Sequence, residues 1–319
     1  MKRRKALKAI LGISLLTATN ASAFTLKKAG MTEEGKKARK KFTFAFFTDV
    51  HLLRNNDRNS HIGFQRALDD VLPKKVDFIL FGGDNVDAYH LEEAEADTLY
   101  GWFKNEVDKR GLKAYYAIGN HDAFYQPKDK EADPNSFGLF QKYFGKLYYS
   151  FDYKGIHFII LNSVNRQDSG YCVGAEQRQW LANHLKEIGI HVPIVVAMHV
   201  PIQSLYGPAV EGKPELVDNL LDYKEVWEIL EPYNIKLILQ GHQHIYEELF
   251  VKDTQFLTGG AVCGKWWSAG DYEKTDKGYM LIEVDKDNNF SWEYNAFVKE
   301  KDGKERWQYT QGTSQYDND

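Results

Sequence analysis

The sequence predicts an α/β fold, with strands and helices alternating in the first half of the chain and short strands dominating its end. Between residues 42 and 118, β-prone apolar runs alternate with segments whose apolar residues have helical spacing. This alternation is typical of parallel strands with helices packed against the sheet. The chain has 319 residues, of which 43% are hydrophobic and 14% aromatic. It can therefore bury a large core, and we expect one large domain over residues 42–300.

The first half is expected to run strand, helix, strand, helix, strand. Residues 42–47, 76–81 and 114–118 are apolar runs of strand length, and residues 91–110 have the length of a helix. The first helix is indicated by the helical spacing of Phe64, Leu68, Val71 and Leu72. Each of the three strands stops at a short polar cluster. Because ligands bind in the crevice beyond the carboxyl ends of parallel strands, these clusters are expected to share one site.

The second half is expected to be richer in strands. Its predicted elements are, in order, a β-hairpin over residues 148–161 with its turn at Lys154-Gly155, a helix over 176–188, strands over 194–197 and 236–239, and short strands between 247 and 297. Both strands that follow the helix end at further polar clusters.

The most informative feature of the chain is a set of seven side chains that can bind metal, gathered in five short clusters. They are Asp49 with His51, then Asp84, Asn120, His199, and finally His242 with His244. Carboxylate, amide and imidazole donors without a thiolate suit Mn²⁺, Fe or Zn²⁺ in a catalytic site better than structural zinc. The number of donors suggests two metal ions, and Asp84 is the natural bridge between them.

Each cluster on its own has a simpler interpretation. Asp49 and His51 can form a strand-end turn or cap, and Asn120-His121-Asp122 can form a turn in which short polar side chains bond their own backbone. His199, before a Val-Pro pair, can be an ordinary core or loop histidine. Only the joint order of the clusters favours a metal site.

Five motifs in this order resemble those of the calcineurin-like metallophosphoesterase superfamily. They are Asp49-Val50-His51, Gly83-Asp84-Asn85-Val86-Asp87, Gly119-Asn120-His121-Asp122, Met198-His199 and Gly241-His242-Gln243-His244. The resemblance spans residues 42 to about 250. It implies a four-layer αββα sandwich of two mixed β-sheets flanked by helices, with a binuclear metal site at the carboxyl ends of the strands.

The resemblance also implies a role for each donor. Asp49, His51 and His244 would hold the first metal, Asn120, His199 and His242 the second, and Asp84 would bridge both. His121 would face the substrate and protonate the departing alkoxide or stabilise the phosphoryl oxygens. Asp87 matches the acidic position that orients this histidine in some of these enzymes, and Asp122 is the rival partner. A metal-bound hydroxide would then attack phosphorus in line.

The motif forms favour a phosphodiesterase. The Asp-x-His first motif, with Asp87 and the Asn-His-Asp cluster, is most similar to class III cyclic-nucleotide and glycerol phosphodiesterases. Purple acid phosphatases usually carry a tyrosine ligand after the bridging aspartate instead. Three alternatives stay open: an exported phosphomonoesterase of broad specificity, a scaffold of the same fold that binds metal without catalysis, and a binuclear hydrolase of amides or lactams.

Contacts to a small-molecule phosphate ester are less well defined. Arg54 and Asn55 follow the first cluster and either touch substrate phosphate or belong to a solvated loop. Trp266 and Trp267 either pack in the core or line the rim of the cleft, where aromatic faces can stack on a base or sugar. Residues 124–144 and 202–217 are the predicted lids.

Charge and the chain's first residues bear on partners and location. The formal net charge of −4 leaves no basic excess, so no stable nucleic-acid complex is expected. Residues 1–23 have the basic start, short apolar stretch and small residues of a cleaved export signal, and Arg3-Arg4 also resembles a twin-arginine signal. We expect a periplasmic or secreted protein with no membrane anchor in its mature form.

The remaining segments and the cysteines complete the sequence-based expectations. Residues 24–41 are rich in lysine and glutamate and are interpreted as a linker or a surface helix, and residues 301–319 as a polar tail. Cys172 and Cys263 are the only cysteines, so they either form one disulfide or remain two buried thiols.

Overall fold

Strand β1 (Phe42–Phe47) lies inside a mixed sheet. One of its neighbours runs parallel to it and the other antiparallel. In this computed structural model, residues 40–89, 91–124, 136–167, 170–213, 218–268, 271–297 and 312–313 are described. Within them the first sheet has the order β14-β13-β12-β1-β2-β3. Its other strands are β2 (Phe78–Gly82), β3 (Ala114–Ala117), β12 (Gly278–Val284), β13 (Phe290–Ala296) and β14 (Gly312–Thr313). The parallel strands β1, β2 and β3 end at the same edge.

The second sheet has the order β10-β11-β9-β8-β5-β4 among the described residues. Its strands are β4 (Tyr149–Tyr153), β5 (Ile156–Ile160), β8 (Ile194–Ala197), β9 (Ile235–Gln240), β10 (Glu247–Val251) and β11 (Thr254–Thr258). The four inner strands run parallel, and the edge strands β4 and β10 are antiparallel to their neighbours. The predicted hairpin is therefore confirmed as β4 and β5. A separate two-stranded ribbon joins β6 (Asn165–Gln167) and β7 (Gly170–Cys172).

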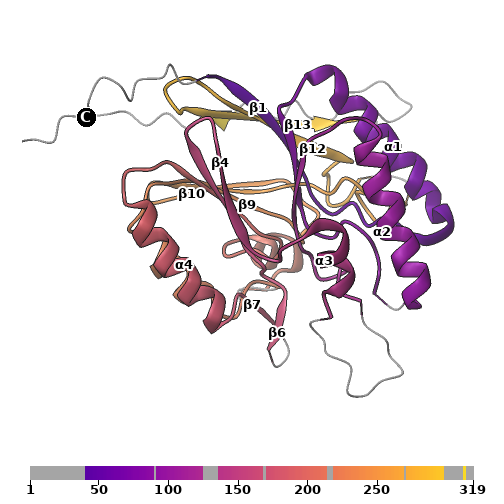
Figure 1. Ribbon diagram of the computed structural model, residues 1–319, viewed down its shortest axis with the longest axis horizontal. Helices are drawn as coiled ribbons and strands as arrows, with labels where there is room; N and C mark the ends of the chain where they lie inside the picture. Colours follow the sequence, from indigo (N-terminus) through magenta and orange to yellow (C-terminus); the bar gives the residue numbers. More distant parts are fainter. Residues whose placement is uncertain are drawn as a thin grey trace, which may run out of the picture. The chain divides into compact units, whose positions relative to one another are not determined.

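Helices cover the outer faces of both sheets (Figure 1). They are α1 (Ser60–Val71), α2 (Glu93–Asp108), α3 (Gly138–Phe144), α4 (Ala175–Ile188) and α5 (Tyr223–Leu230), with short helical turns η2 (Arg54–Asn59), η3 (Leu72–Lys74) and η4 (Gly207–Glu211). Phe64 of α1 packs on Phe81 of β2 at 6.3 Å and on Phe103 of α2 at 4.5 Å between ring centroids. On the other sheet, Leu181 and Leu185 of α4 are fully buried.

The space between the two sheets is filled by aromatic rings. Phe44 and Phe78 stack at 5.0 Å, and Phe158 of the second sheet meets both edge-on at 5.5 and 5.6 Å. All three side chains are fully buried. Burying each such ring contributes about 1.5–3 kcal/mol, so this inner layer fixes the distance and register of the sheets. The four-layer αββα sandwich is confirmed.

Several expectations concern residues outside the described ranges. The predicted export signal lies wholly outside them, as do residues 24–39 of the predicted linker. Of the predicted tail, only Gly312–Thr313 is described, and these two residues pair with β13. Parts of both predicted lids, residues 125–135 and 214–217, also fall outside. Among the described helices, none combines the length and apolar character needed to cross a membrane.

The two cysteines are both free and buried. Of the two alternatives, the structure has two buried thiols rather than a disulfide.

Candidate metal centre

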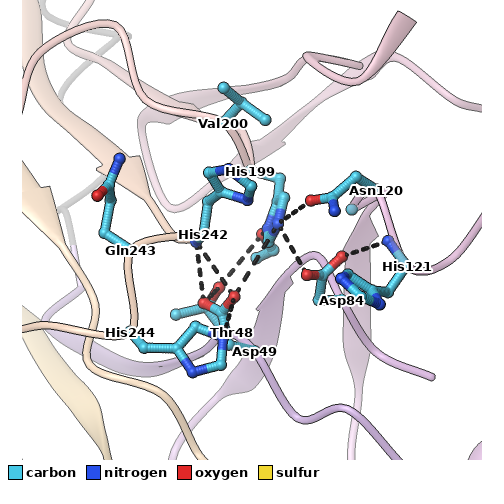
Figure 2. Close-up of polar contacts among 12 residues, drawn as sticks. Thr48, Asp49, Asp84, Asn120, His121, His199, Val200, His242, Gln243 and His244 are labelled. Atoms are coloured by element: carbon cyan, nitrogen blue, oxygen red, sulfur yellow. Dashed lines mark hydrogen bonds and ion pairs between the residues drawn. The ribbon is translucent and has the colours of Figure 1, made fainter. Parts of the chain in front are cut away.

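The five polar clusters meet at one end of the sandwich, where strands of both sheets stop (Figure 2). Asp49, Asp84 and Asn120 follow β1, β2 and β3 of the first sheet. His199 and His242 follow β8 and β9 of the second. Parallel strands deliver their carboxyl ends to the same edge, which explains why residues almost 200 positions apart lie side by side.

Five of these donors occupy a left-handed backbone conformation that non-glycine residues rarely adopt. The φ angles are 55° at Asp49, 43° at His51, 51° at Asp84, 72° at His242 and 58° at His244. Each such conformation costs on the order of 1 kcal/mol or more and persists where the surrounding structure enforces it. Strain concentrated at so many donor positions is typical of a functional site.

Asp84 occupies the middle of the cluster. Its Oδ2 lies 3.2 Å from Nε2 of His51 and 3.2 Å from Nε2 of His199. Its Oδ1 accepts a hydrogen bond of 2.8 Å from the backbone N–H of His121. Asn120 completes this side, with Oδ1 3.1 Å from Nε2 of His199. One carboxylate oxygen therefore faces two histidines from opposite sheets.

Asp49 occupies the other side of the cluster. Its Oδ1 lies 3.4 Å from Nε2 of His244, and its Oδ2 accepts hydrogen bonds from the Thr48 hydroxyl at 2.7 Å and the His242 backbone N–H at 3.1 Å. The Nε2 atoms of His51 and His244 are 3.1 Å apart. These bonds orient a fully buried carboxylate toward a pair of imidazoles.

Backbone carbonyls fix the orientation of two of the imidazoles. Nδ1 of His199 lies 2.9 Å from the carbonyl oxygen of Gly82, and Nδ1 of His244 lies 2.8 Å from that of Gly264. If Nδ1 donates in each case, Nε2 is left as a lone-pair donor that faces the cluster, which is the usual arrangement around a bound metal. Nδ1 of His51 is buried without a partner in the described part of the chain.

Burial and mutual charge set the protonation of the cluster. Burial would raise the pKa of Asp84, but His199, His121 and His51 hold it well below its usual range. Burial lowers the pKa of His242 to about 3, with His199 as the next cause. Burial also opposes the charged form of His199, yet Asp84 outweighs this effect and raises the pKa of His199 to about 9. An ionised Asp84 and a neutral His242 are the forms that coordinate metals, and His199 would release a proton when a cation binds.

The donor set fits two cations that share Asp84. His51, Asp84 and His121 form one group of donor atoms within 4.8 Å of one another, and Asp84, His199 and His242 form a second. Two ligand atoms that each lie about 2.1 Å from one metal are separated by roughly 3 Å, close to the distances around Asp84. The first group contains His51, which was expected to bind metal, and His121, which was expected to face the substrate instead.

His121 is oriented by Asp87. Its Nδ1 lies 2.8 Å from Oδ1 of Asp87, and both side chains are about one-quarter exposed, at 25% and 26%. Burial would lower the pKa of His121, but Asp84 and Asp87 together raise it. Asp122, the rival partner, accepts instead from the backbone N–H groups of Asn85, Val86 and Gly119 and thereby ties the loops after β2 and β3 together.

Cys263 lies behind the cluster. Its Sγ is 3.9 Å from Nδ1 of His244, the nitrogen that faces the Gly264 carbonyl. Burial raises the pKa of this thiol well above its ordinary value, and Asp49 adds to the effect. The Cys263 sulfur also forms a group with donor nitrogens of His51 and His244, all within 4.8 Å of one another, and it would join a cation there only after losing its proton.

A cavity of about 160 Å³ opens onto the cluster. It is lined by His51, Asp84, His121, Tyr206, Asp218, His242, Gln243, His244, Trp266 and Tyr272. Arg54 and Asn55 are not among the lining residues, and the Arg54 guanidinium pairs with Glu95 at 3.2 Å. The geometry therefore gives a substrate role for these two residues no support.

The two tryptophans have different places. Trp266 lines the cavity, with its ring centroid 3.8 Å from that of His51 and 4.8 Å from that of His121. Trp267 is buried, and its indole N–H lies 2.8 Å from the Val50 carbonyl oxygen and 3.0 Å from that of His51. Trp267 thus anchors the loop, and the Trp266 ring contacts His51 and His121 in the cavity wall. Tyr206, Asp218 and Tyr272 line the cavity without any sequence motif to mark them.

Gly119→Ala is expected to disrupt the site. A Cβ at position 119 would lie 2.0 Å from the backbone nitrogen of Asp84 and 2.2 Å from its Oδ1, so Asp84 would have to move. A shift of about 1 Å in a reacting group costs roughly 10²-fold in rate. We expect lower metal content by elemental analysis and at least that loss in kcat/KM. Gly138→Ala is the control, since nothing lies within 4 Å of its added Cβ. Normal metal content in the Gly119 variant would contradict this geometry.

Comparison with known proteins places the chain in a family. A sequence model described as calcineurin-like phosphoesterase matches residues 42–246, which include all five polar clusters. Probable purple acid phosphatase 20 of Arabidopsis thaliana is 36% identical over 104 residues, which are 32% of this chain and 22% of that protein. The chain thus matches less than a quarter of the length of this curated relative.

Solved structures share the fold. A dimetal phosphatase from Danio rerio has a TM-score of 0.61 at 13% identity, over 86% of this chain and 99% of that one. Purple acid phosphatase PPD1 from yellow lupin (Lupinus luteus) seeds has a TM-score of 0.58 at 17% identity, over 86% of this chain and 53% of that one. With its αββα layers, its clustered donors and the family match over most of the folded part, this chain belongs to the calcineurin-like phosphoesterase family.

Proposed function

We propose that this chain is a binuclear metal-dependent phosphoric ester hydrolase, and specifically a phosphodiesterase. The observation that carries the proposal is the position of Asp84, whose Oδ2 lies 3.2 Å from a histidine nitrogen of each donor group. A carboxylate shared in this way suits two cations about 3.5–4 Å apart, the spacing that clamps the attacking and leaving oxygens of a phosphoryl displacement.

The proposed ligands divide into two sets around Asp84. Asp49, His51 and His244 would hold one cation, and Asn120, His199 and His242 would hold the other. This division is supported by the short distances within each set, 3.4 Å between Asp49 and His244 and 3.1 Å between Asn120 and His199. Bound there, Mn, Fe or Zn ions would supply a water molecule of lowered pKa and neutralise the phosphoryl oxygens.

His121 is proposed to act on the leaving group. It lies in the cavity wall beside Asp84, and Asp87 orients its ring through Nδ1. The Asp87 carboxylate, one of the groups that raise the pKa of His121, favours the protonated ring, which can give its Nε2 proton to the departing alkoxide. The ester P–O bond then breaks with the electron pair on the alkoxide oxygen, and that oxygen takes the proton.

Charge in the cavity favours a diester. A phosphodiester carries one negative charge, whereas a monoester carries nearly two at neutral pH. Among the described residues that line the cavity, none is a lysine or an arginine. The position three residues after Asp84 is Asp87, so it carries the partner of His121 in place of a tyrosine. A phosphomonoesterase is the second candidate, favoured by the sequence similarity to purple acid phosphatases.

Paired chromogenic substrates test the proposal. The full chain, loaded in turn with Mn²⁺, Fe²⁺ and Zn²⁺, is assayed on bis(p-nitrophenyl) phosphate and p-nitrophenyl phosphate. We expect kcat/KM to be about tenfold or more higher on the diester, a difference of about 1.4 kcal/mol in transition-state binding. A preference for the monoester would support the phosphomonoesterase instead. If no metal gave activity on either substrate, the proposed hydrolase would be contradicted. A scaffold that binds metal without catalysis would then be the remaining alternative.

A further inference from the structure

The cavity has a second wall, which the proposed hydrolysis does not use. Five of its lining residues are donors of the metal cluster or His121, and the other five are Tyr206, Asp218, Gln243, Trp266 and Tyr272. We call these five residues the alcohol subsite. Because a diester must place an organic group beside the reacting phosphorus, their chemistry bears on which alcohol the site accepts.

Three aromatic rings of the alcohol subsite border the metal cluster. Trp266 lies 3.8 Å from His51 and Tyr272 lies 5.8 Å from His244, measured between ring centroids. The hydroxyls of Tyr206 and Tyr272 are 2.7 Å apart and share a hydrogen bond, which joins the loop after β8 to the loop before β12. The wall is thus held together from two segments of the chain.

The position of Trp266 is enforced by its neighbours. Its backbone has a φ of 50°, and Trp267 beside it has a φ of 61°. The indole N–H of Trp267 reaches two backbone carbonyls of the first donor loop, and Arg58 donates to the carbonyl oxygen of Trp266 at 3.3 Å. These contacts hold Trp266 in a strained conformation, with its ring against those of His51, His121 and His244.

Asp218 gives the same wall a negative charge. Asp218 belongs to the cavity lining, and its φ of 52° is a left-handed conformation. Gln243, which follows the metal donor His242, donates from Nε2 to the Asp218 carbonyl oxygen at 3.4 Å. The charge of Glu211 contributes to raising the pKa of both Tyr206 and Asp218, and Lys213 pairs with Glu211 at 2.6 Å.

We propose that the alcohol subsite takes an ester whose alcohol carries a permanent positive charge, of the quaternary ammonium class. This substrate class rests on the proposed phosphodiesterase. Ring faces attract such a cation through their quadrupoles, by roughly 0.5–2 kcal/mol each, and a nearby carboxylate adds a direct charge interaction. A planar, uncharged base would stack on Trp266 equally well but would gain little from Asp218. Hydrolysis consumes one water and yields a phosphomonoester and an alcohol.

The test compares a cation with its uncharged isostere. Glycerophosphocholine and glycerol 3,3-dimethylbutyl phosphate have the same shape, but only the first carries a quaternary nitrogen. Hydrolysis by the manganese-loaded full chain is followed by phosphorus NMR, which detects cleavage of either ester bond. We expect kcat/KM to be at least tenfold higher for the cationic ester. Asp218→Asn is expected to reduce this ratio to below about threefold. Glu273→Gln, which removes one exposed charge outside the cavity lining, is expected to keep it.

A binding measurement keeps this proposal separate from the proposed function. In the His121→Ala variant, calorimetry with phosphocholine and with 3,3-dimethylbutyl phosphate reports the subsite without turnover. Tighter binding of phosphocholine by tenfold or more, weakened by Asp218→Asn, would support the subsite even if wild-type protein hydrolyses no ester. Equal binding and equal hydrolysis of the cationic compound and its uncharged isostere would overturn the alcohol-subsite proposal. Activity on bis(p-nitrophenyl) phosphate in the same protein would still support the phosphodiesterase. A preference for a nucleoside cyclic phosphate over both would identify a stacking site instead.

Discussion

Asp84→Ala is expected to remove both metal ions and all measurable hydrolysis. The side chain is 2% exposed, and its Oδ2 lies 3.2 Å from a histidine nitrogen of each donor group, whereas Oδ1 of Asp49 lies farther from the same two nitrogens, at 3.9 and 4.0 Å. Bound metals contribute several kcal/mol of charge stabilisation in the transition state. Because each ~1.4 kcal/mol is tenfold in rate, we expect kcat/KM to fall at least roughly 10³-fold. Metal content by elemental analysis and kcat/KM on bis(p-nitrophenyl) phosphate measure the result.

Two further variants give this experiment its contrast. Asp49→Ala removes a carboxylate from one proposed set only, so it is expected to retain about one metal ion per chain. Asp287→Ala changes an exposed residue in the turn between β12 and β13 and is expected to bind two. If Asp84→Ala kept the same metal content as Asp49→Ala, the proposal that both cations share Asp84 would be wrong.

His121→Ala is expected to lower turnover while both metal ions remain. General acid catalysis contributes typically about 10²–10⁴-fold, and this histidine is the side chain that Asp87 orients toward that role. The loss should depend on the leaving group, because p-nitrophenolate departs without a proton and an alkoxide does not. We therefore expect a loss near the upper value on an alkyl diester and a clearly smaller one on bis(p-nitrophenyl) phosphate.

Metal content decides whether His121 is an acid or a ligand. A nitrogen of His121 lies within 4.8 Å of donor atoms of His51 and Asp84, so metal binding is the rival role. If His121→Ala lost as much metal as Asp84→Ala, the role of His121 as a general acid would be refuted. Asp87→Asn is expected to give a smaller loss of turnover with full metal content, and His191→Ala, which is exposed, none.

Sequence patterns were sufficient for the fold's main elements because apolar periodicity and strand-end motifs are local. The strands at residues 42–47 and 194–197 coincide with β1 and β8, and the helix expected at 176–188 is one residue longer in α4. The second strand begins at Phe78, two residues later than expected. Asp77 accounts for this difference, since its carboxylate accepts hydrogen bonds from Thr43 and Tyr153 before the strand begins.

Other elements were not predicted, although Tyr223, Val226, Trp227 and Leu230 of helix α5 have helical spacing. Helix α5, with the sequence Tyr-Lys-Glu-Val-Trp-Glu-Ile-Leu, is only 8 residues long and is stabilised by burial of Val226 and Leu230. The ribbon of β6 and β7 consists of strands of 3 residues each. Elements this short depend on tertiary packing, which a sequence pattern does not report.

Sequence patterns likewise predicted one part of the site and not the other. The polar clusters were identified because each follows a strand, and parallel strands bring them together. The partner of His121 was left open between Asp87 and Asp122, and only the hydrogen bonds assign Asp87 to the ring and Asp122 to the backbone. Neighbouring tryptophans are equivalent in sequence, yet one is buried and the other lines the cavity. Tyr206, Asp218 and Tyr272 come from loops whose course depends on distant contacts.

The origin of the donors in two separate sheets has a mechanical consequence. Asp49 and Asp84 belong to the half of the sandwich built around β1, and His199 and His242 to the half built around β8 and β9. A cation held by donors from both halves is a cross-link at one end, while the aromatic layer holds the remainder. Free metal concentration would then set how firmly the halves close, and a chelator would open that end first.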